Sequence, residues 1–264
     1  MGDAFDSRKS IDYQSLEWAK RVVFEPLSNY QVHMIVGNHD SYYKNTNNTN
    51  SPQLLLKDYP NIQTYSSPTE IKVGDLEVLL LPWICVENEE QSFKMIEKTK
   101  AKIAMGHLEI AGFEMGAGLM CHDGMDKKLF NNFDIVMSGH FHHKSHNGNI
   151  HYLGNPYEIT WVDCNDKRGF HIFDTETTEL EHIINPYKMF HKVYYDEDKK
   201  VSASKYKDKY VKLIVKNRTD SYKFDVFVDE LYKNEVADLS IVDDSTEWDL
   251  KRPLILMQPK IQCH

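Results

Sequence analysis

Short apolar runs alternate with amphipathic stretches along the first two thirds of the chain. Gln31–Val36 and Leu76–Leu81 are apolar and have the length of strands, and the second predicts a strand buried on both faces. Thr69–Val73 lies just before it, across Gly74-Asp75, so the two segments predict a β-hairpin. Glu89–Lys100 has the period of an amphipathic helix. Repetition of strand, loop and helix predicts a layered α/β fold.

Two further helices are predicted near the start of the chain. In the first, Pro26 marks the end, and four apolar residues at helical spacing form one face: Leu16, Ala19, Val23 and Leu27. The polar loop Asn45–Asn50 precedes the second helix. This helix is predicted to begin with Ser51 as its N-cap and Pro52 as its first residue, and to continue to Tyr59.

A boundary is predicted at Asn185-Pro186. Before it, five more segments have strand character: Lys102–Met105, Asp134–Met137, Ile150–Leu153, Gly169–Asp174 and Leu180–Ile184. After a charged connection, Asp196–Lys209, the pattern predicts strand, helix and strand: Tyr210–Val215, Asp220–Lys233 and Val236–Val242. We therefore expect two domains, residues 1–187 and 188–264. The tail from Arg252 to His264 has no clear pattern.

Composition narrows the class of protein. No apolar stretch approaches the roughly 20 residues of a membrane span, and the start has no basic or apolar leader, so a cytoplasmic protein is expected. The four cysteines are far apart, which argues against a disulfide framework or a structural zinc site. The net charge is −9, whereas a protein that grips duplex DNA usually presents a basic face. If DNA is the substrate, bound cations and a partner must supply positive potential.

Four glycine-containing blocks carry the candidate chemistry: Gly2-Asp3, Gly37-Asn38-His39-Asp40, Gly106-His107 and Gly139-His140-Phe141-His142. Each block alone is a weak signal, because Gly-Asp and Gly-Asn are common turn sequences. Together they supply Asp, Asn and His ligands, three of the blocks directly after predicted strands, which indicates a two-metal phosphoesterase centre. Mixed nitrogen and oxygen ligands suit Mn²⁺, Fe²⁺ or Zn²⁺ better than Ca²⁺.

These blocks are similar to motifs two to five of the calcineurin-like metallophosphoesterases. Within that superfamily the chain most resembles SbcD-type DNA repair nucleases, and more narrowly the recombination endonuclease subunits of T-even-like bacteriophages. Five segments carry this likeness: Leu81-Pro82-Trp83, Gly106–Glu109, Ser138–His142, Leu153–Pro156 and Arg168–Phe170. The resemblance implies a layered β-sandwich flanked by helices for residues 1–187. For residues 188–264 it implies, more loosely, a small α/β capping domain.

The same resemblance implies roles for individual residues. Asp3 would bridge two divalent metal ions. Mn²⁺ is the expected metal, and Fe²⁺, Zn²⁺ and Mg²⁺ are the alternatives. The remaining metal ligands would be Asn38, His107 and His140 at one ion and His142 at the other. His39 would contact the scissile phosphate as an acid or charge stabiliser, and Asp40 would orient His39.

The family's first motif, an Asp-x-His pair, does not precede Gly2 in this sequence. The resemblance therefore implies a nuclease lacking its first strand and motif, with only Asp3 and His142 left at the second metal. We expect this to impair activity. The capping-like domain is likewise expected to be shortened, with the partner-docking helices of the family beyond its end.

The function implied is a metal-dependent DNA exo/endonuclease subunit of a recombination or repair complex. The sequence has no P-loop motif, and the implied partner is an SbcC-type ABC ATPase with a coiled coil; a homodimer is also compatible. Two alternatives stay open. One is a phosphomonoesterase or cyclic-nucleotide phosphodiesterase on the same scaffold, and the other is an inactive fragment or scaffold for the ATPase partner.

Overall fold

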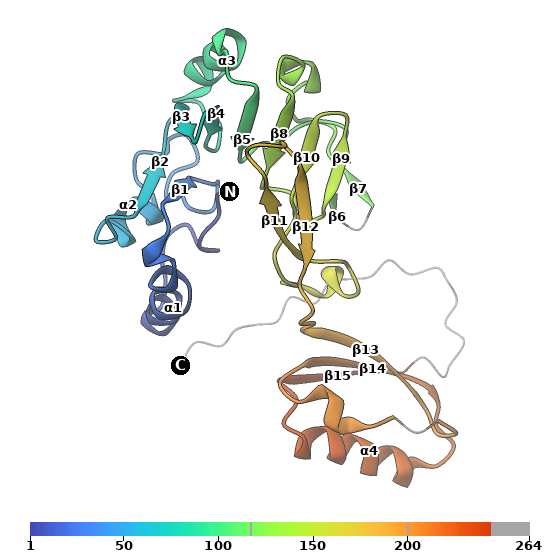
Figure 1. Ribbon diagram of the computed structural model, residues 1–264. Coiled ribbons are helices and arrows are strands. Elements are labelled where there is room, and N and C mark those ends of the chain that lie inside the picture. Colours follow the sequence, from blue (N-terminus) through green and yellow to red (C-terminus); the bar gives the residue numbers. More distant parts are fainter. Residues whose placement is uncertain (117, 200, 244–264) are drawn as a thin grey trace. The chain divides into compact units, whose positions relative to one another are not determined.

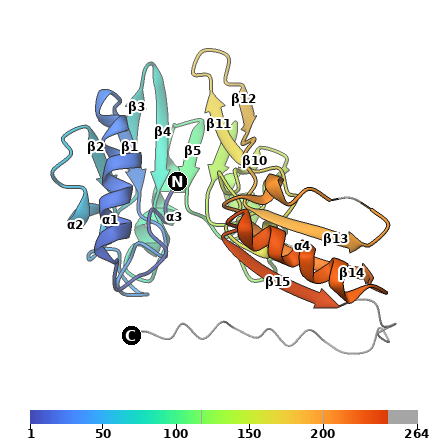
Figure 2. The same cartoon turned by 90° about the horizontal axis from the view of Figure 1, so that it is seen from below.

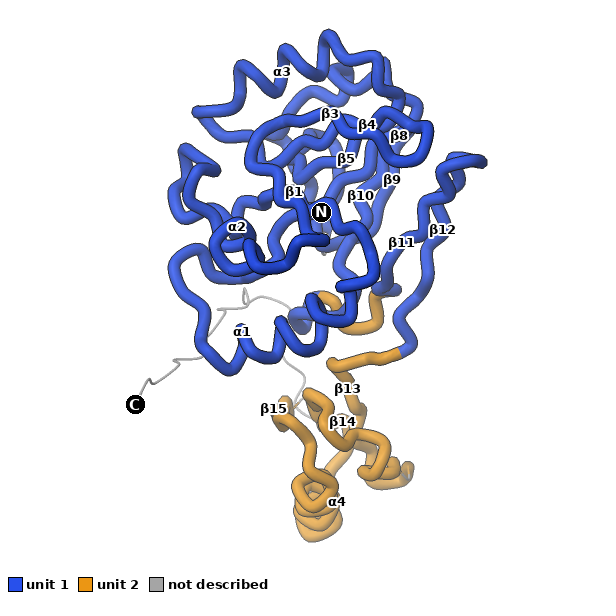
Figure 3. Tube along the Cα trace, turned by 60° about the vertical axis from the view of Figure 1, so that its left-hand side comes forward, with its two compact units in different colours: residues 1–162, 167–186 blue, residues 163–166, 187–264 orange. Residues whose placement is uncertain are grey.

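The computed structural model describes residues 1–116, 118–199 and 201–243. The chain divides into two compact units (Figure 3). Unit 1 consists of Met1–Val162 and Lys167–Pro186, and unit 2 of Asp163–Asp166 and the chain from Tyr187 onward. The segment from Arg252, for which no pattern was predicted, lies outside the described residues. No helix in the described ranges has both the length and the apolar character needed to cross a bilayer.

A six-stranded sheet forms the centre of unit 1 (Figure 1). In spatial order its strands are β3 (Thr69–Val73), β4 (Leu76–Leu81), β5 (Ile103–Gly106), β8 (Ile135–Ser138), β10 (Ile150–Tyr152) and β9 (Ser145–Asn147). The four strands from β4 to β10 run parallel, and β3 and β9 are antiparallel to their neighbours. The predicted hairpin of β3 and β4 is confirmed, and Gly74 adopts the left-handed backbone its turn requires, with φ +60°.

Alternate residues of β4 pack on opposite faces of the sheet. Leu79 and Leu81 face helix α3 (Glu89–Lys98) and the 3-10 helix Lys127–Phe130. Val78 and Leu80 face a second layer made of four strands: β1 (Val32–Ile35), β2 (Ile62–Tyr65), β11 (Gly169–Phe173) and β12 (Leu180–Ile184). Complete burial of each such side chain contributes about 1.5–3 kcal/mol. The predicted mixed, layered α/β architecture is thus confirmed.

The first predicted helix is only partly right. Its regular part, α1 (Tyr13–Ala19), is capped by Asp12 and buries no residue. A π-helical turn, Lys20–Phe24, follows and inserts one extra residue into the helical repeat. As a result Phe24 is 4% exposed and packs near Phe5, whereas Val23, placed on the apolar face by the sequence pattern, is 39% exposed.

The second predicted helix begins and ends differently from the prediction. Helix α2 is Ser51–Leu55, and its N-cap is Asn50 rather than Ser51, because the Asn50 side chain accepts a hydrogen bond from the Gln53 amide at 2.9 Å. A tight turn from Leu56 to Tyr59 replaces the last predicted turn of helix. The cap residue predicted was wrong by one position.

Several short strands were not predicted: β2, β6 (Glu114–Gly116), β7 (Leu119–Met120), β9 and β13 (Phe190–Asp196). Most of them have two to four residues, which is too short for a period of two to stand out. Strand β13 is longer but mixes lysine, histidine and aromatic residues on its two faces. Its pairing partner, the strand Tyr210–Asn217, lies later in the chain and determines its conformation.

Unit 2 is a three-stranded parallel sheet with one helix along one face (Figures 1 and 2). The order is β13, β14 (Tyr210–Asn217) and β15 (Asp238–Asp243), and the helix is α4 (Ser221–Lys233). Asp220 caps α4 by accepting hydrogen bonds from the amides of Tyr222 and Lys223. Apolar side chains of β13 and β14 pack against α4 and the 3-10 helix Ala203–Tyr206.

A cross-strand histidine pair makes the stability of unit 1 dependent on pH. The rings of His171 and His182 stack at 4.6 Å on β11 and β12. Burial, then the charges of His182, Lys144 and His151, lower the pKa of His171 to about 4. The usual pKa of a histidine is about 6.5. Below that pH the unfolded chain binds a proton at His171 that the folded chain does not bind. The contribution of neutral His171 to the free energy of unfolding is therefore complete above about pH 6.5 and is lost as the pH falls toward about 4. His171→Gln should therefore flatten the fall of the melting temperature between neutral pH and pH 5, and an unchanged slope would contradict this.

Candidate metal centre

Three strands of unit 1 deliver the candidate ligands from their carboxyl ends. β1 ends at Ile35 just before Gly37-Asn38, β5 ends at Gly106 next to His107, and β8 ends at Ser138 before Gly139-His140. β5 and β8 are parallel neighbours with Gly106 paired to Ser138. Their ends therefore meet at one edge of the sheet, where Asp3 also lies.

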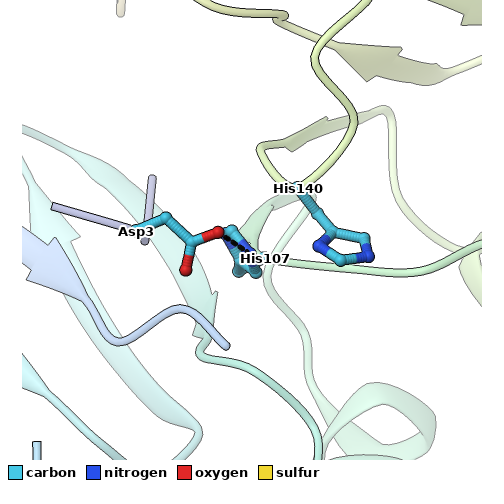
Figure 4. Close-up of side chains that lie close together, drawn as sticks. All are labelled: Asp3, His107 and His140. Carbon is cyan, nitrogen blue, oxygen red and sulfur yellow. Dashed lines mark ion pairs between the residues drawn. The ribbon is translucent and has the colours of Figure 1, made fainter. Parts of the chain in front are cut away.

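Four side chains place acceptor atoms close together at this edge. His107 Nε2 lies 3.0 Å from Asp3 Oδ2 and 2.9 Å from Asn38 Oδ1, and His140 Nδ1 lies 3.1 Å from the same Asn38 oxygen. Asp3, His107 and His140 have ligand atoms within 4.8 Å of one another (Figure 4). Two ligands at right angles around one ion, each about 2.1 Å from it, would be about 3.0 Å apart. The spacing therefore suits ligands that share a cation.

The backbone carbonyl of Met1 orients the His107 ring. His107 is 1% exposed, and its Nδ1 lies 2.8 Å from the Met1 oxygen. A carbonyl only accepts, so Nδ1 carries the proton and the Nε2 lone pair is directed toward Asp3 and Asn38. In that tautomer three acceptors face one another, an arrangement that a bound cation stabilises.

Asp40 anchors the backbone that carries Asp3. Its carboxylate accepts hydrogen bonds from the amides of Asp3, Ala4 and Gly37 at 2.8–2.9 Å, and it is 1% exposed. Burial raises the pKa of Asp40, although the Gly37 amide acts in the opposite direction. These contacts hold the backbone of Asp3, and the role predicted for Asp40 in orienting His39 stays a prediction.

The electrostatics keep the ligands in the forms that bind metal. Burial would raise the pKa of Asp3; when the His107 ring is protonated, its hydrogen bond and charge outweigh burial and lower the pKa of Asp3, and the His39 amide acts in the same direction. Burial, then the charge of His107, lowers the pKa of His140 to about 4. At neutral pH the carboxylate is therefore ionised and the His140 imidazole is neutral, as metal binding requires.

His39 lies beside this group of ligands and is accessible to solvent. Its backbone amide donates to Asp3 Oδ1 at 2.7 Å, which ties its loop to the ligand group. Its ring Nδ1 lies 2.7 Å from the carbonyl of Asp6, so the proton on Nδ1 is donated there. The side chain is 46% exposed. His39 can thus present Nε2 to a ligand from solution.

His142 is not part of the three-residue group. It is exposed, its carbonyl accepts a hydrogen bond from the Arg168 guanidinium, and its charge contributes to the lowered pKa of His140. It therefore lies near the centre, and its role as a ligand of a second ion stays a prediction.

Comparison with known proteins agrees with this geometry. The family model for calcineurin-like phosphoesterases matches residues 1–144, more than half of the chain. The chain belongs to the calcineurin-like phosphoesterase family. Its members hydrolyse phosphate esters, and the family implies divalent metal ions, which fit the mixed Asp, Asn and His donors described above.

The curated relatives of this chain include nuclease subunits. Exonuclease subunit 1 of Enterobacteria phage T4 is 34% identical over 254 residues, which covers 94% of this chain and 73% of the phage protein. The SbcD component of the SbcCD nuclease of Staphylococcus epidermidis is 31% identical over 98 residues, 34% of this chain and 26% of that protein. The SbcD component of Staphylococcus saprophyticus is 23% identical over 240 residues, 77% of this chain and 63% of that protein. A nuclease role fits this phosphoesterase.

Two residues of this phosphoesterase centre were not assigned a role from the sequence. The ring of Trp83 lies 5.1 Å from that of His140 and 6.2 Å from that of His107, so it forms one wall of the site. Glu109 Oε2 lies 3.8 Å from His140 Nε2, the nitrogen that points away from Asn38. Both residues lie in segments that carry the family resemblance, Leu81-Pro82-Trp83 and Gly106–Glu109, and this was the available signal.

Gly37 is required for the close approach of Asp3. A Cβ atom at Gly37 would lie 2.2 Å from Asp3 Oδ1 and 2.3 Å from the Asp3 amide nitrogen. Gly37→Ala should therefore displace Asp3 and weaken metal binding about 10- to 100-fold, as misplacing a ligand does. Gly74→Ala is the control, because a Cβ there meets nothing within 4 Å and only backbone strain is added. Equal Mn²⁺ affinity of both variants by calorimetry would refute the requirement.

Proposed function

We propose that this protein is a Mn²⁺-dependent DNA exo/endonuclease subunit of a recombination or repair complex, acting in the host cytoplasm. The observation that carries the proposal is the convergence of acceptor atoms from Asp3, Asn38, His107 and His140 at the carboxyl ends of the strands. The naming of the phage and bacterial relatives as nuclease subunits supports DNA as the substrate.

Asp3, Asn38, His107 and His140 would hold one ion, and Asp3 with His142 would contribute to a second. When bound, such ions polarise a phosphate and make water a stronger nucleophile at neutral pH. The protein residues contribute positioning: Asp40 fixes the backbone of Asp3, and Met1 fixes the His107 tautomer. Both ligands would then meet the ions without further reorganisation.

His39 would donate a proton to the leaving oxygen of the scissile phosphodiester. The Asp6 carbonyl accepts from Nδ1, so Nε2 is the nitrogen that faces the substrate. General acid catalysis by such a group contributes about 10²–10⁴-fold to the rate.

A net charge of −9 bears on how DNA is held. Duplex binding depends on neutralising phosphates, which an acidic chain does poorly by itself. We propose that the metal ions and an SbcC-type ABC ATPase with a coiled coil supply the remaining positive potential, and that the subunit also pairs with a second copy of itself.

The test compares three substrates with Mn²⁺ and with EDTA: linear duplex DNA, single-stranded DNA and a small chromogenic phosphate ester. Mn²⁺-dependent cleavage of DNA that outpaces hydrolysis of the ester supports the proposal. Hydrolysis of the ester alone would favour a phosphomonoesterase. If none of the three substrates is hydrolysed and the protein does not bind Mn²⁺, a scaffold role is favoured. The His39→Ala variant, purified in parallel, separates the protein's activity from contaminating nucleases.

A further inference from the structure

The backbone on either side of Glu109 is held by hydrogen bonds beside the metal centre. The amide of Leu108 donates to Ser138 Oγ at 3.0 Å, and the amide of Ile110 donates to the Tyr152 hydroxyl at 3.0 Å. The same hydroxyl donates to the Leu108 carbonyl at 3.0 Å, and burial raises the pKa of Tyr152, so its proton stays in place. Leu108 and Ile110 are fully buried. The main chain of Glu109 therefore has a fixed position, and its side chain is the part that can move.

The side chain of Glu109 is directed to the proposed metal ligand His140. Its Oε2 atom lies 3.8 Å from His140 Nε2, while Nδ1 of the same ring lies 3.1 Å from Asn38 Oδ1. The Glu109 side chain is 42% exposed and that of His140 is 19% exposed. A hydrogen bond from Nε2 requires a separation of about 2.7–3.2 Å. Because the glutamate side chain has several rotatable bonds and is partly exposed, a small rotation brings its oxygen within that range.

Neighbouring rings fix the plane of the His140 imidazole but not its orientation within that plane. The centre of the Trp83 ring lies 5.1 Å from that of His140, and the centre of the Phe141 ring lies 5.2 Å away. A half-turn about the Cβ–Cγ bond leaves the plane unchanged, because this torsion is roughly two-fold for histidine. The half-turn would replace Nδ1 by a carbon atom at the ligand group. An acceptor opposite Nε2 selects the correct orientation, and Glu109 is placed there.

The position of the ring proton leads to the same requirement. A neutral histidine that binds an ion through Nδ1 carries its proton on Nε2, because the neutral ring has a single N–H group. At His107 the Met1 carbonyl accepts the proton of the nitrogen that faces away from the other ligands. At His140 the Glu109 carboxylate has the corresponding position. An ionised carboxylate accepts more strongly than a carbonyl and makes the imidazole a better ligand.

We propose that Glu109 is a positioning residue for the metal centre: its carboxylate accepts a hydrogen bond from His140 Nε2 and holds Nδ1 toward the divalent cation. Within the proposed function this rests on His140 as a ligand and not on DNA as the substrate. In this role Glu109 contacts neither the ion nor the substrate, and it acts only through His140. Residues that support a histidine ligand in this way contribute about 10- to 100-fold to metal affinity.

The experiment measures Mn²⁺ affinity by calorimetry, and by the Mn²⁺-induced shift in melting temperature where binding is weak. Glu109→Ala should weaken binding about 10- to 100-fold. Glu109→Gln should restore most of this loss, because its side-chain oxygen still accepts from Nε2. In the His140→Ala background the change Glu109→Ala should have no further effect, since both residues act through one interaction. Glu77→Ala, which removes an exposed carboxylate near the amino end of β4, should bind like the parent.

Circular dichroism and the melting temperature without metal establish that each variant is folded. Unchanged Mn²⁺ affinity in Glu109→Ala would overturn the proposal. An equal loss with and without the His140 ring would overturn it as well, because Glu109 would then bind the ion directly or attract it by charge alone. No recovery of affinity in Glu109→Gln would likewise argue against the hydrogen bond.

The dependence of the rate on Mn²⁺ separates positioning from catalysis on whichever substrate is hydrolysed. Excess Mn²⁺ should return the rate of Glu109→Ala close to that of the parent, because only the occupancy of the site is lowered. A rate that stays low at saturating Mn²⁺ would contradict the positioning role. A parent that shows the expected differences in affinity but never cleaves DNA would refute the nuclease proposal alone. DNA cleavage by a protein whose Mn²⁺ affinity does not depend on Glu109 would refute this inference alone.

Discussion

Replacing His39 with alanine is expected to reduce DNA hydrolysis about 10²–10⁴-fold while the protein keeps its full metal content. The reason is that the backbone amide and the ring of His39 make different contacts. The backbone amide of His39 is bonded to Asp3, and its ring is held by the Asp6 carbonyl, outside the Asp3, His107 and His140 group. Alanine retains the amide and removes only the ring. The ligand group should therefore keep its geometry while the leaving oxygen loses its proton donor.

The measurement pairs initial rates on labelled linear DNA with Mn²⁺ titration by calorimetry. His122→Ala is the control, because His122 is another exposed histidine of unit 1 and has no place in the ligand group. Lost metal in His39→Ala would contradict the assigned role and identify His39 as a ligand. A rate close to that of the parent would remove His39 from catalysis.

His140→Ala is expected to weaken Mn²⁺ binding by at least about 100-fold, beyond the range for residues that only support a ligand. His140 reaches the site from the end of β8, where its backbone has φ +75°, and its Nδ1 lies 3.1 Å from Asn38 Oδ1. Because burial and the charge of His107 keep its pKa at about 4, the ring is neutral over the usual working range. The alanine variant loses the neutral ring nitrogen that would bind the ion, and a water molecule in its place would be a weaker ligand.

The effect can be followed through stability as well as affinity. A ligand at 100 times its Kd stabilises the folded state by about 2.7 kcal/mol, so Mn²⁺ should raise the melting temperature of the parent and not that of His140→Ala at the same concentration. His151→Ala is the control, since His151 lies on β10 of the same sheet and stacks on His146 instead. An Mn²⁺-induced shift as large in His140→Ala as in the parent would show that His140 is no ligand.

Local sequence patterns were sufficient for much of the framework. The hairpin around Gly74, the strand Leu76–Leu81 and the helix that begins at Glu89 depend on turn chemistry and periodicity within about ten residues. Patterns failed where a neighbour far along the chain decides the conformation. Burial of Phe24 instead of Val23 follows from a π-helical turn, and β13 is a strand because β14 pairs with it.

The sequence by itself determined which ligand types are available and that most of them follow strands: Asn38 after β1, His107 after β5, and His140 after β8. Only the tertiary structure decided which atoms meet. Asp3 and His107 are 104 positions apart, and their 3.0 Å separation exists because Asp40 binds the Asp3 amide and Gly37 has no side chain to block it. The contacts of Trp83, Glu109 and the Asp6 carbonyl arose in the same way. Residue types and their order are properties of the chain, whereas distances between remote groups are set by the packing of the sheet and the loops at its edge.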